Sequence, residues 1–211
     1  HARRARNGRV LPCHPRRDAA TCPHGRVISC TARHGTDEEC LGEPLCPDCY
    51  DYTGAVLFNA VAPLLWKRFA DALRRHLATL GGLTLPQLRD QLIVSFAKVA
   101  EYQRRGVVHF HAVIRLDGPD GPTSAPPTWA TADMLAHAVR HAAAAVTVTP
   151  PALDREPARI LRWGNQLNTR PITMDGELTE QAVAAYIAKY ATKAAECVGT
   201  LDRRITSAED L

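Results

Sequence analysis

The segment VVHFHAVIRL, residues 107–116, decides the fold, because it has the composition of a β-strand. Half of its residues are β-branched or aromatic, it contains no proline, and Gly106 and the turn sequence DGP (117–119) bound it. Alternate residues of a strand share a face, so one face of this strand is apolar and can pack on a core. The opposite face carries His109 and His111. Two imidazoles on one face can converge on a divalent metal; the alternative is two surface histidines with no common role.

Residues 92–102 predict a second strand, joined to the first by the three-residue loop RRG (104–106). A three-residue hairpin loop favours glycine at its left-handed position. This loop length places Glu101 opposite His109, with Cβ atoms about 5 Å apart; a two-residue loop would put Glu101 on the other face. Two histidines and one glutamate with open positions suit Mn²⁺ or Mg²⁺, and also accept Zn²⁺ in vitro.

The segment 180–197 predicts a helix, because it is rich in alanine, lacks glycine and proline, and follows Thr179 as N-cap. Positions i, i+3, i+4 and i+7 of a helix share a face. The residues at these positions are Tyr186, Lys189, Tyr190 and Lys193. An ordinary amphipathic helix with packed tyrosines and solvated lysines is the alternative to a catalytic face.

These two segments together resemble HUH endonucleases. His109-Phe110-His111 resembles their His-hydrophobic-His motif, and YIAKY (186–190) resembles their Tyr-x-x-Lys-Tyr motif in its two-tyrosine form. The order, histidine strand first and tyrosine helix later, is that of rolling-circle replication initiators. The resemblance implies α+β architecture, with a central antiparallel ferredoxin-like sheet that carries helices on one face. It also implies metal-dependent nicking and joining of single-stranded DNA through a 5′-phosphotyrosine.

Other segments are similar to the initiators of actinomycete plasmids and integrative conjugative elements. They are LCPDCYDY (45–52) and WGNQ (163–166), and the similarity extends over roughly residues 20–200. Asn168 departs from the pattern, since the resemblance implies an aspartate there. The implied catalytic residues are Tyr186, Tyr190, Lys189 and Lys193; the implied ligands of a catalytic Mn²⁺ or Mg²⁺ are His109, His111 and Glu101.

Six of the seven cysteines precede residue 50, which predicts a zinc-binding module rather than disulfides. CPDC (46–49) has metal-knuckle spacing and supplies the firmest half-site, Cys46 and Cys49. The preferred other half is Cys30 and His34, with Cys22 as a further candidate ligand. Tetrahedral Zn²⁺ accepts either Cys₃His or Cys₄ ligation. The remaining cysteines and histidines could form a second site: Cys13, His14, His24 and Cys40.

The rest of the chain alternates between apolar periodic segments and turns. Helices are expected at 59–80, with a regular start near Pro63, at 85–91 as a short turn, and from Thr131 to residue 145; one or two strands are expected within 160–172. His137 and His141 are four residues apart in the third helix, where surface or packing roles are favoured over chelation. We therefore divide the chain into a disordered basic tail (1–9), a zinc-binding module (10–54) and a catalytic domain (55–211).

The charge of the N-terminal segment and the length of the apolar runs indicate the partners and the location to expect for the protein. Residues 1–34 hold eight arginines against one aspartate, a net charge of +7, which fits a polyanionic partner. The expected partners are single-stranded or hairpin origin DNA, a host helicase and a polymerase. No apolar run approaches the roughly 20 residues that span a bilayer, so we expect no membrane association and a bacterial cytoplasmic location. Because the chain starts with His1, we expect it to be a fragment of a longer protein.

Three other functions are consistent with the same residues. A transposase or relaxase of the same superfamily would share the chemistry and read a different DNA site. A metal-dependent phosphoesterase would cleave DNA without a covalent intermediate. A non-enzymatic zinc-dependent regulator would bind DNA without cleaving it.

Overall fold

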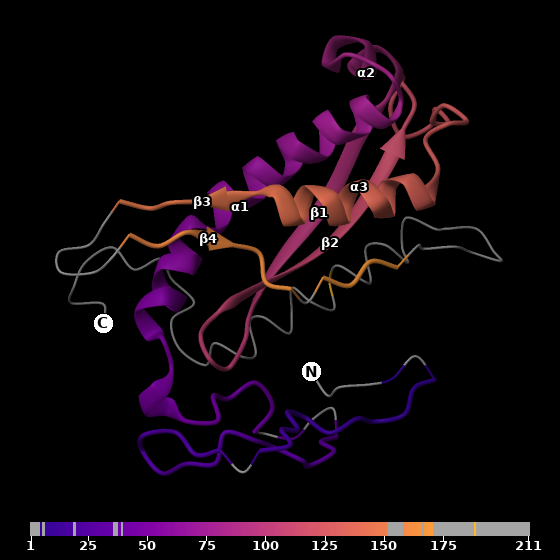
Figure 1. Ribbon diagram of the computed structural model, residues 1–211. Helices are drawn as coiled ribbons and strands as arrows, with labels where there is room; N and C mark the ends of the chain where they lie inside the picture. The colour runs from indigo at the N-terminus through magenta and orange to yellow at the C-terminus, as the bar shows by residue number, and fades with distance from the viewer. Residues whose placement is uncertain are drawn as a thin grey trace.

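The computed structural model describes residues 5, 7–18, 20–35, 38, 40–151, 158–165, 167–170 and 188. The elements in chain order are one 3-10 turn, three helices and four strands within this part of the chain (Figure 1). Their bounds are η1 (Pro47–Cys49), α1 (Tyr52–Leu80), α2 (Leu85–Gln91), β1 (Ile93–Tyr102), β2 (Val108–Asp117), α3 (Ala132–Ala145), β3 (Thr147–Val148) and β4 (Leu161–Arg162).

Helix α1 begins at Tyr52, seven residues before the expected start at Asn59. The prediction of a regular start near Pro63 was wrong, since Pro63 lies inside the helix. A proline there removes one helical hydrogen bond at a cost of about 3 kcal/mol. The Asp51 side chain caps the earlier start by accepting a hydrogen bond of 2.9 Å from the Gly54 amide. This cap, together with a face of α1 that is buried on both sides of Pro63, offsets the cost of the proline.

Strands β1 and β2 form the predicted antiparallel hairpin, and its predicted register is confirmed. Glu101 pairs with His109, and the Gln103 amide donates a 2.9 Å hydrogen bond to the Val107 carbonyl oxygen. Gly106 closes the loop with φ of 81°, a left-handed conformation that favours glycine. The three-residue loop thus sets which residues of β1 share a face with the histidines of β2.

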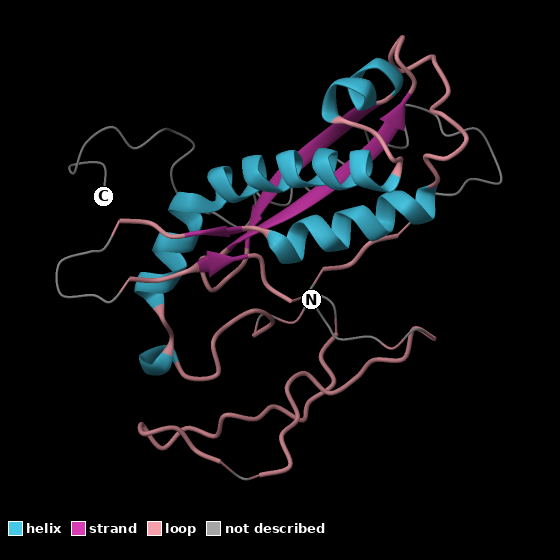
Figure 2. Cartoon of the chain, turned by 45° about the horizontal axis from the view of Figure 1, so that its top comes forward, coloured by secondary structure: helices cyan, strands magenta, loops and turns pink. Residues whose placement is uncertain are grey.

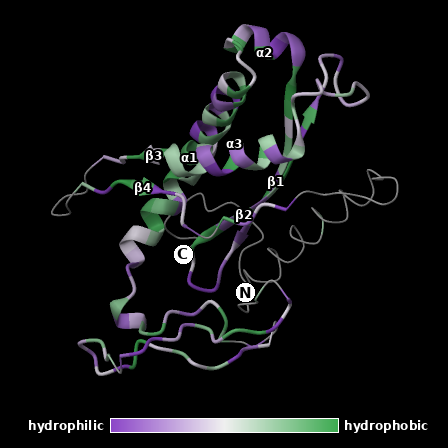
Figure 3. Ribbon diagram, turned by 45° about the vertical axis from the view of Figure 1, so that its right-hand side comes forward, coloured by the Kyte–Doolittle hydropathy of each residue, from purple (hydrophilic) through white to green (hydrophobic). Residues whose placement is uncertain are grey.

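The core lies between the hairpin and two helices, α1 and α3, which run next to one another along it (Figure 2). Leu65, Leu73 and Leu77 of α1 are its largest fully buried side chains. The predicted apolar face of β2 contributes Leu116 to this core, and Phe110 contacts Trp66 with ring centroids 5.8 Å apart. In Figure 3 hydrophobic and hydrophilic stretches alternate along α1 and α3, as expected of helices that bury one face.

The α+β class is confirmed for the described residues. Their strands form two separate two-stranded antiparallel sheets, β1 with β2 and β3 with β4. The larger ferredoxin-like sheet stays a prediction. The predicted short helix α2 and the helix α3, capped by the Thr131 side chain, are both present. No helix in the described part of the chain is both long and apolar enough to cross a membrane.

The described residues between 10 and 50 form loops with a single 3-10 turn, and they lie below the start of α1 in Figure 1. Two isolated antiparallel bridges, His14 with Cys30 and Thr21 with Val27, order these loops. Glu43 lies 3.9 Å from Arg104 of the hairpin loop, so this segment reaches the end of the β1–β2 hairpin.

Candidate functional site

The hairpin places Glu101, His109 and His111 on one face, as the loop length predicted. Glu101 pairs with His109 across the strands, and its Oε2 lies 2.8 Å from His111 Nε2, the diagonal neighbour. The His109 and His111 rings are 4.8 Å apart between centroids and nearly perpendicular. A carboxylate and two imidazoles from two adjacent strands therefore stand side by side, which is a donor set for a divalent cation.

Burial shapes the electrostatics of this face. The Glu101 side chain is only 9% exposed and that of His111 11%, so each needs the polar partner it finds in the other. Burial, followed by the neighbouring His111, holds the pKa of His109 below its usual value. A lowered pKa favours the neutral imidazole, which is the form that binds metal.

Helix α1 fixes the end of the hairpin next to these residues. The Asn59 side chain donates a 2.7 Å hydrogen bond to the Gly106 carbonyl oxygen and accepts one of 2.9 Å from the Val108 amide. Both bonds join α1 to the residues that immediately precede His109. Sequence patterns did not single out Asn59, because a lone polar residue on a helix carries no spacing signal.

Asp117, at the far end of the histidine face, is a second residue that the sequence argument missed. Its side chain is 3% exposed and accepts hydrogen bonds from Ser95 Oγ at 2.6 Å and from Arg115 Nη2 at 3.3 Å. Its place six residues after His111, on the same alternating face of the strand, is the signal that could have found it. Both carboxylate oxygens are engaged by these partners, which indicates a role in holding the strand ends together.

Three groups of side chains in the described part of the chain have ligand atoms within 4.8 Å of one another, and all three lie before residue 50. Glu101, His109 and His111 are not among them, because their ligand atoms do not all approach to that distance. The three groups are Cys22, His24, Cys46 and Cys49; Cys13, Cys30 and His34; and His34, Glu38 and Cys40.

The first group differs from the predicted grouping of zinc ligands. Cys46 and Cys49 meet Cys22 and His24, whereas the preferred partners, Cys30 and His34, lie in a different group. The reason is the backbone: the Cys22 amide bonds the Arg26 carbonyl oxygen at 2.9 Å, a tight turn that brings Cys22 and His24 together. The two cysteines of CPDC thus belong to a cluster of four Cys and His side chains that could hold a metal such as zinc.

Distances and acidities within this cluster suit a tetrahedral ion. His24 Nδ1 lies 3.2 Å from the Cys49 sulfur and 3.7 Å from the Cys46 sulfur. Desolvation, the largest influence, raises the pKa of Cys22, but hydrogen bonds from nearby amides and thiols outweigh it and lower that pKa to about 7. Desolvation and the neighbouring thiols raise the pKa of Cys49 to about 11. Four crowded ligands of which one ionises easily are typical of a site completed by a cation.

The segment predicted to form the tyrosine-bearing helix lies outside the described residues except for Ala188, and Tyr186, Lys189, Tyr190 and Lys193 are not among the residues described. Asn168 is exposed. His137 and His141 of α3 lie against His76 of α1, with the His76 and His141 rings stacked at 3.7 Å between centroids. Stacking on another imidazole is consistent with the packing role that was favoured for both.

Comparison with known proteins decides the family. The family described as "Replication initiator protein, pSAM2" (RepSA) matches residues 1–211, which is the whole chain. The chain belongs to this replication initiator family. A replication initiator protein of Streptomyces ambofaciens is 53% identical over 205 residues, covering 95% of this chain and 43% of the relative. The initiator chain described here therefore spans less than half the length of that curated relative. No solved structure matches it significantly.

Proposed function

We propose that this replication initiator chain nicks and rejoins single-stranded origin DNA through a 5′-phosphotyrosine, as an HUH-type endonuclease. The observation that carries the proposal is the convergence of Glu101 with His111 at 2.8 Å, beside His109, on one face of the hairpin. The motif YIAKY (186–190) and membership of the replication initiator family add to it. A regulator that only binds DNA would not require a buried carboxylate on the same face as two histidines.

The donor set fits a divalent cation. His109, His111 and Glu101 would hold Mn²⁺ or Mg²⁺, since a carboxylate and neutral imidazoles leave open positions for phosphate oxygens. When bound, the ion would polarise the scissile phosphate and neutralise the charge that develops on it. Because Glu101 is buried, water screens the electrostatic interactions of its carboxylate only weakly.

Tyr186 and Tyr190 are the proposed nucleophiles. A free phenol with a pKa of about 10 is ionised to roughly one part in a thousand at pH 7, a deficit of about 4 kcal/mol. The attacking phenol oxygen forms a bond to phosphorus and loses its proton. The bond from phosphorus to the 3′-oxygen breaks, and that oxygen leaves as a hydroxyl after taking up a proton. Lys189 would stabilise the charge on the phosphate.

Two tyrosines allow two successive transfers. We assign the first attack to Tyr186 by motif position. Tyr190, with Lys193 three residues further on, would run the reverse transfer that ends a round of replication. Origin DNA is the proposed substrate, and a host helicase and polymerase are the proposed partners in extending the 3′-hydroxyl.

The N-terminal cysteine cluster is proposed to hold a structural Zn²⁺ through Cys22, His24, Cys46 and Cys49. The loops around it contain few buried apolar residues, so metal ligation would supply much of their folding free energy. Cys49 is followed directly by Tyr50 and by Asp51, the N-cap of α1, so this ion would fix the start of the helix that anchors the hairpin. Arginines of the same loops would contact the DNA backbone.

The proposal is tested with a single-stranded origin oligonucleotide and Mn²⁺, followed by denaturing electrophoresis. We expect a protein–DNA band that EDTA abolishes and that His109→Ala and His111→Ala each lose, while the matched control His137→Ala keeps it. Cleavage that survives Phe at both Tyr186 and Tyr190 would indicate a phosphoesterase. Binding without any cleavage would indicate a regulator, and cleavage restricted to another class of hairpin would indicate a transposase or relaxase.

A further inference from the structure

We propose that the N-terminal loops bind a second zinc ion through Cys13, Cys30 and His34, with Cys40 as the fourth ligand. The ligands of the two zinc ions then alternate along the chain. The ligand atoms of Cys13, Cys30 and His34 lie within 4.8 Å of one another and share no residue with the cluster at Cys46 and Cys49. Thiolates and imidazole are the ligands of structural zinc sites.

Backbone pairing brings together the two segments that carry Cys13 and Cys30, whose ligand atoms lie within 4.8 Å of one another. His14 and Cys30 form an antiparallel bridge with hydrogen bonds of 2.8 and 2.9 Å between their amides and carbonyl oxygens. The Cys13 amide continues this pairing with a 2.9 Å bond to the Ala32 carbonyl oxygen. Cys13 and Cys30 are therefore fixed beside one another before any ion binds.

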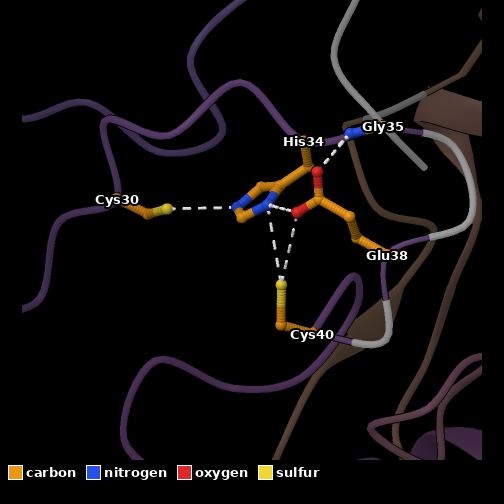
Figure 4. A network of polar contacts seen from close by, with 5 residues as sticks. All are labelled: Cys30, His34, Gly35, Glu38 and Cys40. Carbon is orange, nitrogen blue, oxygen red and sulfur yellow. Dashed lines mark hydrogen bonds and ion pairs between the residues drawn. The ribbon is translucent and has the colours of Figure 1, made fainter.

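Glu38 orients His34 as a carboxylate commonly orients a metal-binding histidine. His34 Nδ1 lies 2.5 Å from Glu38 Oε2, and the other oxygen of Glu38 accepts a 2.7 Å hydrogen bond from the Gly35 amide (Figure 4). The opposite ring nitrogen, His34 Nε2, lies 3.2 Å from the Cys30 sulfur, which is close to the spacing of two ligands on one ion. A carboxylate on one ring nitrogen and the metal position on the other is the usual arrangement at zinc sites.

Cys40 supplies the fourth ligand, a third thiol. Its sulfur meets the same imidazole at 3.5 Å from Nδ1, on the ring edge that Glu38 also contacts. Because this edge faces away from Cys30, binding of a tetrahedral ion at Nε2 requires the Cys40 side chain to reorient, while Glu38 holds His34 in place. The resulting Cys₃His set has the same composition as the cluster formed by Cys22, His24, Cys46 and Cys49.

The two ligand sets alternate along the chain. Cys13 precedes Cys22 and His24, which precede Cys30, His34 and Cys40, which precede Cys46 and Cys49. Each ion therefore closes a loop that contains ligands of the other, so that neither loop can open without straining the second site. This alternation of the ligands of two metal ions explains how loops with a single 3-10 turn and isolated bridges keep a defined conformation.

The test is the zinc content of the purified 211-residue chain, measured by native mass spectrometry in the presence of a weak chelator. We expect two ions per chain, one after Cys30→Ser, one after Cys46→Ser, and two after the matched thiol control Cys197→Ser. Helical circular dichroism from α1 and α3 reports whether each variant is folded. One ion in the unmodified chain, or two in Cys30→Ser, would overturn the proposal, and two ions bound with unchanged affinity in Cys40→Ser would remove Cys40 from the ligand set.

A conservative variant covers the case in which cysteine variants fail to fold. Glu38→Gln keeps the size of the side chain and removes the charge that orients His34. We expect it to weaken one of two zinc affinities by about 10- to 100-fold and to leave the other unchanged. Titration with Co²⁺, read from thiolate charge-transfer absorbance, measures both affinities; two unchanged affinities would show that Glu38 does not support a metal site.

Discussion

Replacing Asn59 with alanine should loosen the hairpin from helix α1. The substitution removes the 2.7 Å bond to the Gly106 carbonyl oxygen and the 2.9 Å bond from the Val108 amide. A typical hydrogen bond contributes about 1 kcal/mol net, and an unsatisfied buried amide costs somewhat more. Val108 is buried at 9% exposure, so its amide has little access to water. We therefore expect Asn59→Ala to lower the free energy of unfolding by about 2 kcal/mol, which corresponds to roughly 4–8 °C in Tm for a chain of this size.

The assay is urea unfolding of the zinc-loaded chain, monitored by circular dichroism. Asn59→Asp is the matched control: it retains an acceptor for the Val108 amide and loses the donor to Gly106, so its stability should fall between that of the unmodified chain and Asn59→Ala. Hydrogen exchange at Val108 should accelerate in Asn59→Ala and less in Asn59→Asp, which keeps the acceptor for this amide. A loss below about 0.5 kcal/mol in Asn59→Ala, with unchanged exchange at this amide, would refute the idea that α1 positions the hairpin through this side chain.

Three further predictions concern the core, a helix cap and pH. Leu65→Ala, at a fully buried position, should cost about 3 kcal/mol in urea unfolding, whereas Val56→Ala, at a side chain 67% exposed, should stay within about 0.5 kcal/mol. Thr131→Ala removes the 3.2 Å cap bond from the Met134 amide and should cost about 1 kcal/mol; Thr131→Ser should retain most of it. Burial first, then His141 and His137, hold the pKa of His76 below its usual value. The unfolded chain therefore binds more protons, so stability should be full above about pH 6.5 and fall as the pH drops below it, a slope that His76→Phe should reduce.

The hairpin and its charged face could be predicted from sequence because local rules decide them. A three-residue loop whose last residue is glycine joins the two strand segments, and its length sets the register. The register alone puts Glu101 opposite His109. The start of α1 could not be predicted in this way. Proline signals a helix start in most contexts, and only the Asp51 cap and the tertiary burial of α1 reveal that Pro63 is internal.

Residue spacing in the sequence also could not predict which ligands share one metal ion. CPDC indicated a candidate half-site, because two cysteines three positions apart can bind the same ion without help from the rest of the chain. The partner half-site depends on which loops lie next to one another, and the turn at Cys22 to Arg26 decides this through backbone hydrogen bonds that no spacing encodes. Sequence spacing likewise did not predict the contact of Glu38 with His34, because the conformation of the loop determines it.

Mass-spectrometric mapping of the protein–DNA adduct tests the central claim most directly. The chain is incubated with the origin oligonucleotide and Mn²⁺, digested with protease and nuclease, and searched for a tyrosine that carries a 5′-nucleotide. The account predicts the modification on Tyr186 or Tyr190 in the unmodified chain and its loss in Glu101→Ala, while Asp133→Ala, a carboxylate at the start of α3, retains it. A cleaved oligonucleotide with no adduct on either tyrosine, or an undiminished adduct in Glu101→Ala, would contradict it.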